Sequence, residues 1–333
     1  MTKTILAGAL ILAAMADGAW AQAKPASIAI GVQVIPNDEL LAKAQGWYEK
    51  ELGVKVEFKQ FDSGRDVNTA FASGSLDFGL VGSTPTAVGI SRGLAYQVFW
   101  IHDLIGTAEA LAVKNKADVQ KLADLKGKKV AVPFGSTTHY SLLSALKLEG
   151  VAASDVTILD LQPPEIFAAW QRGDIDAAYV WQPTLGKLLA DGKVLTDSSV
   201  LASKGIVTAD LGLVSTAFAQ KYPDFVTKYV RIQDKAYQLF KAQPDAASAL
   251  LAQGLGTDNA EALKEAKELV WLSVKDEISP AYLGTAAQKG DLAKTLKSTA
   301  DFLAAQKLID AAPELAVFQA AVAPQFAEAA AKK

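Results

Sequence analysis

The feature that most constrains the fold is an alternation of strand-like and helix-like segments, which runs through the chain twice. In the first round, strands are expected at residues 27–34, 54–61, 76–81 and 95–101. In the second round, which starts after Gly106, they are expected at residues 109–113, 130–132, 156–161 and 177–181. Helical segments between strands, among them one that opens at residues 36–39 and runs through about Leu52 and a short one at residues 116–126, provide the crossovers that parallel strands need. The sequence therefore predicts two α/β units with mostly parallel sheets.

The chain is expected to pass between these units twice, near residues 106–109 and near residues 207–210. After Tyr222 the pattern predicts alanine-rich amphipathic helices, at residues 225–241, 244–253, 259–268 and 291–307. We expect these helices to pack on the first unit. Lobe 1 then comprises residues 24–107 and 210–333, and lobe 2 comprises residues 108–209. Two such lobes form a hinged cleft that can close around a small solute.

The composition excludes several classes of function. The 333 residues carry a formal net charge of -3, so the chain lacks the positive field that nucleic-acid binding requires. The absence of cysteine removes disulfides, thiolate nucleophiles and cysteine-ligated metals. The two histidines are His102 and His139, and together they offer little material for a metal site. We therefore expect no metal, no cofactor and no nucleic-acid partner.

Residues 1–23 have the pattern of a secretory signal peptide. Lys3 provides a positive charge and residues 5–16 form an apolar core that is too short to span about 30 Å of bilayer. Small-x-small cleavage motifs end at Ala21 and at Ala23. An exported chain without disulfides is expected in a bacterial periplasm.

Hydroxyl side chains cluster at two expected helix starts. Ser83 and Thr84 follow a strand of the first unit, and Ser136, Thr137 and Thr138 follow residues 130–132 in the second. One hydroxyl is enough to cap a helix. The additional hydroxyls, the free N–H groups and the positive end of the helix dipole together suit a small anion.

Carboxylates and aromatic side chains add a second kind of contact. Glu109 and Asp210 lie at the two crossings, where they suit an ammonium group better than a plain anion. Trp181 and Tyr140 can form an aromatic wall with a cation–π contribution. Anion donors and carboxylates at one cleft predict a small zwitterionic ligand.

A hydrolase is the alternative from a different class. Ser136 and His139 are close in sequence at a helix start, and Asp210 could complete a triad with them. The chain has no G-x-S-x-G motif for a nucleophile elbow, and it has no G-x-G-x-x-G motif or P-loop for a nucleotide. The residues alone leave the binding protein and the hydrolase open.

Several segments resemble the periplasmic taurine-binding proteins of ABC importers. They are VAVPFGSTTHYSLLSALKLEG at 130–150, LQPPEIFAAWQRGDIDAAYVWQP at 161–183, DGKVLTDS at 191–198 and FDSGRDVNTAFASGSLDFGLVGSTP at 61–85. The resemblance implies a type II periplasmic binding fold with extra C-terminal helices. It also implies a monomeric receptor, not an enzyme, that captures taurine as a sulfur source. The receptor would deliver taurine to an inner-membrane permease and its ATPase.

The resemblance also assigns roles in the site. Sulfonate oxygens would meet the loops around Ser83–Thr84 and Thr137–Thr138, and Asp210 would bind the amine. The complete set of expected ligand-binding residues is Asn37, Ser83, Thr84, Glu109, Thr137, Thr138, His139, Trp181 and Asp210. Two positions depart from the family pattern, because Asn37 stands where a Glu is expected and Gln182 where a small Ala is common. Another small sulfonate therefore stays open as the ligand.

Overall fold

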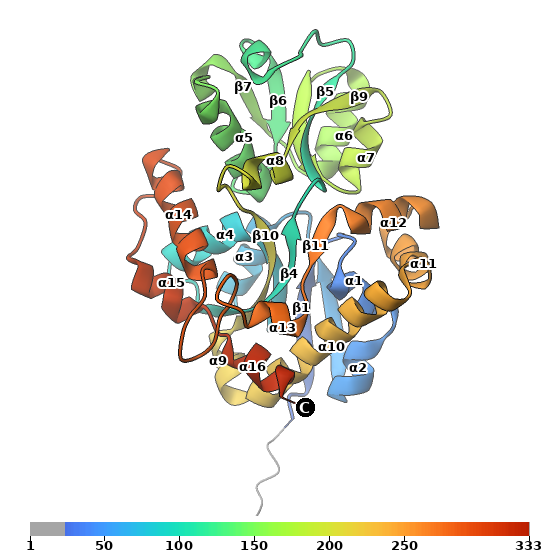
Figure 1. The fold of residues 1–333 in the computed structure, drawn as a ribbon, viewed down its shortest axis with the longest axis vertical. Coiled ribbons are helices and arrows are strands. Elements are labelled where there is room, and N and C mark those ends of the chain that lie inside the picture. Colours follow the sequence, from blue (N-terminus) through green and yellow to red (C-terminus); the bar gives the residue numbers. More distant parts are fainter. Residues whose placement is uncertain (1–23, 333) are drawn as a thin grey trace, which may run out of the picture.

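The computed structural model describes residues 24–332 and arranges them in two lobes, each built around one β-sheet (Figure 1). The expected signal peptide at residues 1–23 lies outside the described residues. The lower lobe in Figure 1 contains a six-stranded sheet in the order β11-β4-β10-β3-β1-β2. The upper lobe contains a five-stranded sheet in the order β7-β6-β8-β5-β9.

The strands of the six-stranded sheet are β1 (Ser27–Val32), β2 (Lys55–Gln60), β3 (Phe78–Gly82), β4 (Tyr96–Ile105), β10 (Ala209–Ser215) and β11 (Leu269–Trp271). The first helices that cover it are α1 (Asp38–Ala44), α2 (Trp47–Leu52), α3 (Gly64–Ala72) and α4 (Ser83–Ser91). The C-terminal helices are α9 (Thr216–Lys221), α10 (Pro223–Ala242), α11 (Pro244–Leu255), α12 (Asn259–Lys267), α13 (Val274–Glu277), α14 (Leu292–Ala305), α15 (Leu315–Ala321) and α16 (Gln325–Ala331).

The strands of the five-stranded sheet are β5 (Glu109–Lys114), β6 (Lys129–Val132), β7 (Thr157–Asp160), β8 (Ala177–Trp181) and β9 (Gly192–Asp197). Its helices are η1 (Leu122–Leu125), α5 (Thr137–Leu148), η2 (Ala153–Asp155), α6 (Pro163–Arg172), α7 (Thr184–Leu188) and α8 (Ser198–Ala202). The chain enters this sheet between β4 and β5 and leaves it between β9 and β10.

Both sheets are mixed, which differs from the mostly parallel pairing expected from the sequence. The pairs β1–β2, β1–β3, β6–β7 and β6–β8 are parallel. The strands that adjoin the crossings run the other way, since β10 is antiparallel to β3 and β4, and β5 is antiparallel to β8 and β9. A strand that arrives directly from the other lobe has no crossover helix to reverse its direction, so it pairs antiparallel.

Two local helix predictions were wrong, and two strands were missed. The helix expected through Leu52 is divided into α1 and α2, because Gly46 has the left-handed φ of 64°. The helix expected at residues 116–126 is reduced to the short 3₁₀ helix η1. The strands β9 and β11 were not predicted; β11 is only three residues long, and β9 is mostly half-buried.

A buried polar cluster joins α1 to β4 beneath the cleft. Asp38 accepts hydrogen bonds from Trp100 Nε1 at 2.7 Å and lies 2.6 Å from His102 Nδ1. All three side chains are almost fully buried. Burial lowers the pKa of His102, but Asp38, Glu39 and Asp210 together raise it further, so its net pKa lies above the usual value. The cluster fixes the position of β4, which carries the chain into the upper lobe.

The C-terminal helices pack mainly on the lower lobe. Helix α10 packs against α1, and α14 packs against α4. One of them, α14, also reaches the upper lobe. The ring of Phe302 in α14 packs edge-to-face on Tyr140 of α5, with 5.1 Å between the ring centroids. The C-terminal segment therefore contributes to the contact between the lobes.

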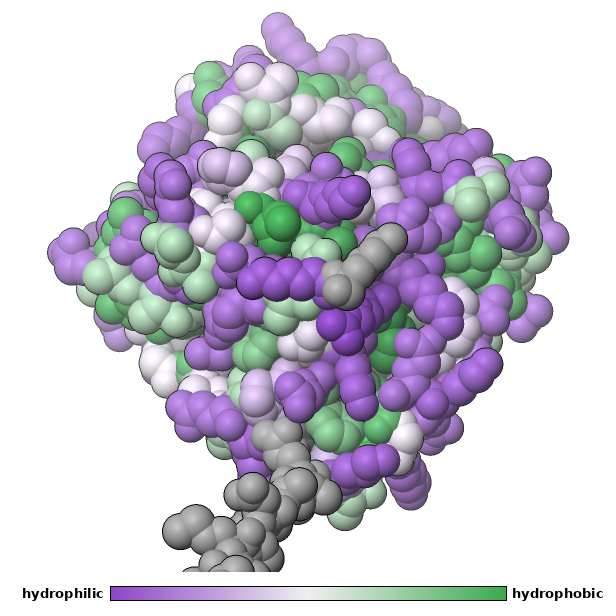
Figure 2. Space-filling model, turned by 60° about the horizontal axis from the view of Figure 1, so that its bottom comes forward, coloured by the Kyte–Doolittle hydropathy of each residue, from purple (hydrophilic) through white to green (hydrophobic). Residues whose placement is uncertain are grey.

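The surface in Figure 2 is largely hydrophilic, with hydrophobic residues in small separate groups. Within residues 24–332, no helix combines the length and the apolar character that a membrane span needs.

Asp38→Ala is predicted to lower the free energy of unfolding by about 3–5 kcal/mol, because it leaves the buried His102 and Trp100 Nε1 without their acceptor. Urea denaturation of the purified ligand-free protein measures the change. Asp301→Asn is the control, since it breaks an exposed pair with Lys297 and should cost less than about 1 kcal/mol. Equal effects of the two variants would contradict a structural role for the Asp38 cluster.

Candidate ligand-binding cleft

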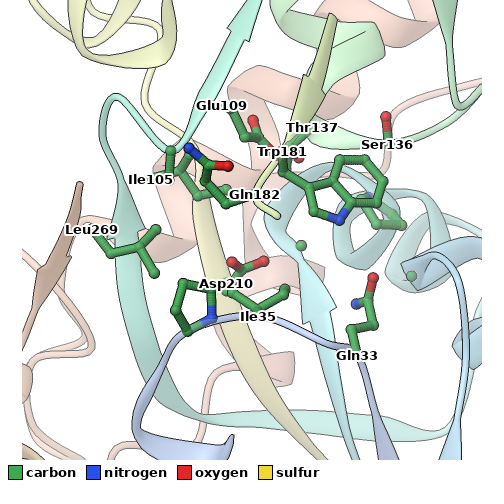
Figure 3. Close-up of a pocket in the computed structure, with 15 residues that line it drawn as sticks. Gln33, Ile35, Ile105, Glu109, Ser136, Thr137, Trp181, Gln182, Asp210 and Leu269 are labelled. Atoms are coloured by element: carbon green, nitrogen blue, oxygen red, sulfur yellow. Dashed lines mark hydrogen bonds between the residues drawn. The ribbon is translucent and has the colours of Figure 1, made fainter. Parts of the chain in front are cut away.

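A small cavity lies between the two lobes at the ends of the strands that cross between them (Figure 3). Lobe 1 contributes Gln33, Gly82 and Asp210, among others, and lobe 2 contributes Glu109, Thr137 and Trp181. Only about 30 Å³ of the cavity is available to the centre of a water-sized sphere. The lobes are thus closed, and the space between them fits a ligand of few heavy atoms rather than a drug-sized molecule.

The upper wall of the cavity is the N-terminus of α5. Ser136 caps this helix by accepting a hydrogen bond from the His139 N–H at 3.2 Å. No acceptor within residues 24–332 pairs with the N–H groups of Thr137 and Thr138, the first two residues of the helix. These amides and the helix dipole form a donor site for an anion.

The N-terminus of α4 lies opposite that of α5. Gly82 caps α4 without a side chain, and its lack of a Cβ atom allows close approach. A Cβ atom at Gly82 would lie 2.9 Å from Thr137 Cγ2 and 3.7 Å from Asp210 Oδ1. Two helix N-termini from different lobes therefore meet at one point, together with a carboxylate.

Glu109 lies at the start of β5 and faces the cavity from the upper lobe (Figure 3). It accepts a hydrogen bond from the Thr137 hydroxyl, and Ser198 Oγ donates to its second oxygen at 3.3 Å. Burial raises the pKa of Glu109 to about 8. At pH 7, Glu109 is therefore mostly neutral.

Asp210 lies at the start of β10 and faces the cavity from the lower lobe (Figure 3). It is directly opposite Gly82 in β3 and Asp103 in β4. Burial raises the pKa of Asp210 to about 6, while His102 acts in the opposite direction. Asp103 is fully buried, and burial, followed by Asp210, raises its pKa well above the usual range. Asp210 therefore carries the negative charge of this pair at pH 7.

Trp181 and Gln182 form the part of the cavity wall between Glu109 and Asp210. Trp181 ends β8, directly opposite Glu109 in β5. The Gln182 amide is used within the protein, because Nε2 donates to Glu268 at 2.8 Å and Oε1 accepts from the Gly186 N–H at 2.9 Å. Gln182 thus joins lobe 2 to the C-terminal segment of lobe 1.

The structure places four of the nine expected ligand-binding residues on the cavity wall: Glu109, Thr137, Trp181 and Asp210. The other five lie outside this wall. Asn37 caps α1, Ser83 Oγ accepts from the Ala209 N–H, and Thr138 Oγ1 bonds to Ser136. Thr84 is fully buried and its hydroxyl has no partner in the described residues. His139 lines a different pocket, together with Phe134, on which its ring stacks.

The expectation that Ser136 and His139 could form a catalytic pair was wrong. Ser136 Oγ donates to the Pro133 carbonyl at 2.6 Å and accepts from the backbone, not the ring, of His139. The His139 ring accepts from the Gly135 N–H at 3.2 Å and stacks on Phe134 at 4.5 Å. The serine therefore has no base to activate it.

Sequence reasoning missed Gln33, Ile105, Leu269 and Asp103. The first three line the cavity, and Asp103 lies behind Asp210. An acidic residue inside the apolar strand 96–105 was the available signal for Asp103. Within residues 24–332, no three His, Asp or Glu side chains come together in an arrangement that could hold a metal ion.

Comparison with known proteins agrees with this architecture. The NMT1/THI5 like family model matches residues 38–247. The chain belongs to this family. It is 43% identical over 235 residues to the taurine-binding periplasmic protein of Escherichia coli K12, covering 71% of this chain and 72% of the relative. This is a family of substrate-binding proteins, and the chain is not an enzyme.

Solved structures share the two-lobed fold of the present chain. The alkanesulfonate-binding protein SsuA of Xanthomonas axonopodis pv. citri, bound to MOPS, matches with a TM-score of 0.75 at 25% identity, over 90% of this chain and 99% of that chain. The desulfurization enzyme DszB matches with a TM-score of 0.64 at 16% identity, over 92% and 99% of the two chains. At that identity the likeness to DszB extends to the fold alone.

The ligand-free protein is predicted to become more stable as the pH falls from 8 to 6. Burial raises the pKa of Glu109 to about 8 and that of Glu39 to about 7, so the folded state holds protons that the unfolded chain has lost. Stability must then rise with falling pH, on the order of 2–4 kcal/mol across this window. The raised pKa of His102 acts in the same direction.

Urea denaturation at pH 6, 7 and 8 measures this dependence, and Glu109→Gln should reduce its slope. His139, whose pKa burial lowers to about 4, opposes the trend as the pH falls through about 6.5, where the unfolded histidine takes up its proton. A stability that increases toward pH 8 would show that these carboxyl groups are not protonated in the folded state.

Proposed function

We propose that this protein is a periplasmic receptor that captures taurine between its two lobes and delivers it to an ABC transporter. The observation that carries the proposal is the pairing of two unlike ends in one small cavity. Anion donors of α4 and α5 lie with a single buried carboxylate, Asp210. Taurine has one sulfonate and one ammonium group and is small enough for such a space.

The sulfonate is assigned to the helix N-termini. The free N–H groups of Thr137 and Thr138, with the Ser83–Thr84 end of α4, offer neutral donors to three sulfonate oxygens. Thr84 Oγ1 is buried without a partner in the described residues, but it lies outside the cavity wall, so the sulfonate is assigned to the backbone N–H groups. Neutral donors hold the anion without a strong ion pair to a cationic side chain, and this helps its release to a permease.

The ammonium group is assigned to Asp210. Because Glu109 and Asp103 are neutral at pH 7, Asp210 is the charge that a cationic group would neutralise. Trp181 provides an aromatic wall beside it. A ligand without an amine would leave the carboxylate buried and unpaired, which is costly.

The relatives support the ligand class and the location. The name of the Escherichia coli relative, a taurine-binding periplasmic protein, gives its ligand and its location. The Xanthomonas structure holds a larger sulfonate, MOPS. Another small aliphatic sulfonate is therefore the second candidate ligand for the cleft.

Asp210→Asn separates the two ends of the ligand. In the wild type, calorimetric titration should show taurine binding more tightly than ethanesulfonate by ~2 kcal/mol or more, because ethanesulfonate lacks the amine. Asp210→Asn should weaken the binding of taurine by ~2–4 kcal/mol and leave the binding of ethanesulfonate unchanged or make it tighter. Asp301→Asn, on the exposed face of α14, serves as the matched control and should bind as the wild type does.

Other outcomes have distinct meanings. Equal binding of taurine and ethanesulfonate by the wild type would refute a zwitterion site. Equal weakening of both ligands by Asp210→Asn would show that Asp210 acts on closure or folding. Glu109 would then be the first alternative for the amine.

A further inference from the structure

A second pocket, here called the lateral pocket, lies beside the cleft and is much larger. It is lined by Arg92, Leu94, Phe134, His139, Leu303 and Leu308, among others. Its volume is about 410 Å³, compared with about 30 Å³ for the cleft by the same measure. Pro85 is the one residue that lines both. The two spaces are therefore neighbours with different walls.

The lateral pocket has a positive and an apolar part. Among residues 24–332, its lining includes Arg65 and Arg92 but no acidic residue. Arg65 is engaged by Asp160 at 2.9 Å. No carboxylate of residues 24–332 pairs with Arg92, so its guanidinium is available to an anion. Leu94, Leu303 and the exposed Leu308 form the apolar wall.

His139 adds a hydrogen-bond donor to this pocket. Its Nδ1 atom accepts from the Gly135 N–H, so the neutral ring carries its proton on Nε2. Phe134 holds the ring flat by parallel stacking, with an interplanar angle of 2°. The buried ring, for which the sequence predicted a place in the cleft, thus faces a pocket that the proposed function does not use.

We propose that the lateral pocket binds a second ligand, an organic anion with an apolar body, when the lobes are closed. The anionic group lies at Arg92 and His139, and the apolar body lies on the leucine wall. Helices α3, α4 and α14 and the turn after α4 supply one side from lobe 1, and the loop between β6 and α5, with His139 of α5, supplies the other from lobe 2. Opening of the lobes separates these sides, so the second ligand favours the closed form.

A consequence is coupling between the two sites. Any ligand that closes the cleft assembles the lateral pocket, so each ligand should raise the affinity for the other by the same factor. The interlobe pair Arg65–Asp160 lies at the pocket edge, and Asp160 also accepts from the Phe134 N–H at 2.8 Å. Closure and pocket assembly therefore share contacts.

Calorimetric titration with 2-naphthoate tests the proposal, and uncharged 2-naphthylmethanol is the matched ligand. We expect one equivalent of 2-naphthoate to bind the wild type, at least tenfold more tightly than the alcohol. Arg92→Gln should lower the affinity for 2-naphthoate about tenfold. His139→Phe, which keeps a ring stacked on Phe134, should lower this affinity several-fold. Arg172→Gln removes the same charge on lobe 2 outside the pocket and should have no effect. Saturating taurine should strengthen 2-naphthoate binding several-fold.

Each contrary result overturns the proposal. Displacement of 2-naphthoate by taurine would place it in the cleft. Absence of 2-naphthoate binding to the wild type would exclude the lateral pocket as an anion site. Equal binding by the wild type and Arg92→Gln, with both proteins shown to be folded by circular dichroism, would exclude it as well. Unchanged affinity in the presence of bound taurine would refute the link to closure. If taurine itself does not bind, the comparison of wild type with Arg92→Gln still decides the anion site.

Discussion

The closed cleft depends on the burial of carboxyl groups where the chain crosses between the lobes. Glu109 begins β5 and Asp210 begins β10, so both crossings deliver an acidic side chain to the same cavity. Burial of two negative charges on the wall of one small cavity would be unfavourable. The raised pKa of Glu109 and its bonds from Thr137 and Ser198 leave it mostly neutral, and one charge stays on Asp210.

That single charge explains the rest of the site. Helix N-termini from both lobes offer amide donors to an anion, and Asp210 offers an acceptor to a cation. The buried Asp38 cluster holds β4, and β4 holds Asp103 behind Asp210. Gly82 allows α4 and α5 to approach, because a larger residue would push Thr137 away. Ligand selection and lobe closure thus use the same atoms.

The sequence predicted the two rounds of strands and the positions of Glu109 and Asp210 at the crossings, because apolar periodicity and turn residues are local signals. It did not predict which hydroxyls face the ligand. Side chains of successive helix residues differ by about 100° in direction, so the Thr137 side chain faces the cavity while those of Thr138 and His139 do not, although the backbone N–H groups of the first turn all point along the helix axis. Strand register, which brings Asp103 beside Asp210, is set by tertiary pairing and was likewise not predictable.

The most direct test is a crystal structure of the protein with taurine bound. We predict the sulfonate oxygens within hydrogen-bond distance of the Thr137 and Thr138 N–H groups, and the ammonium group against the Asp210 carboxylate. A reversed ligand, with its sulfonate toward Asp210, or a ligand outside the cleft would contradict the assignment of the two ends.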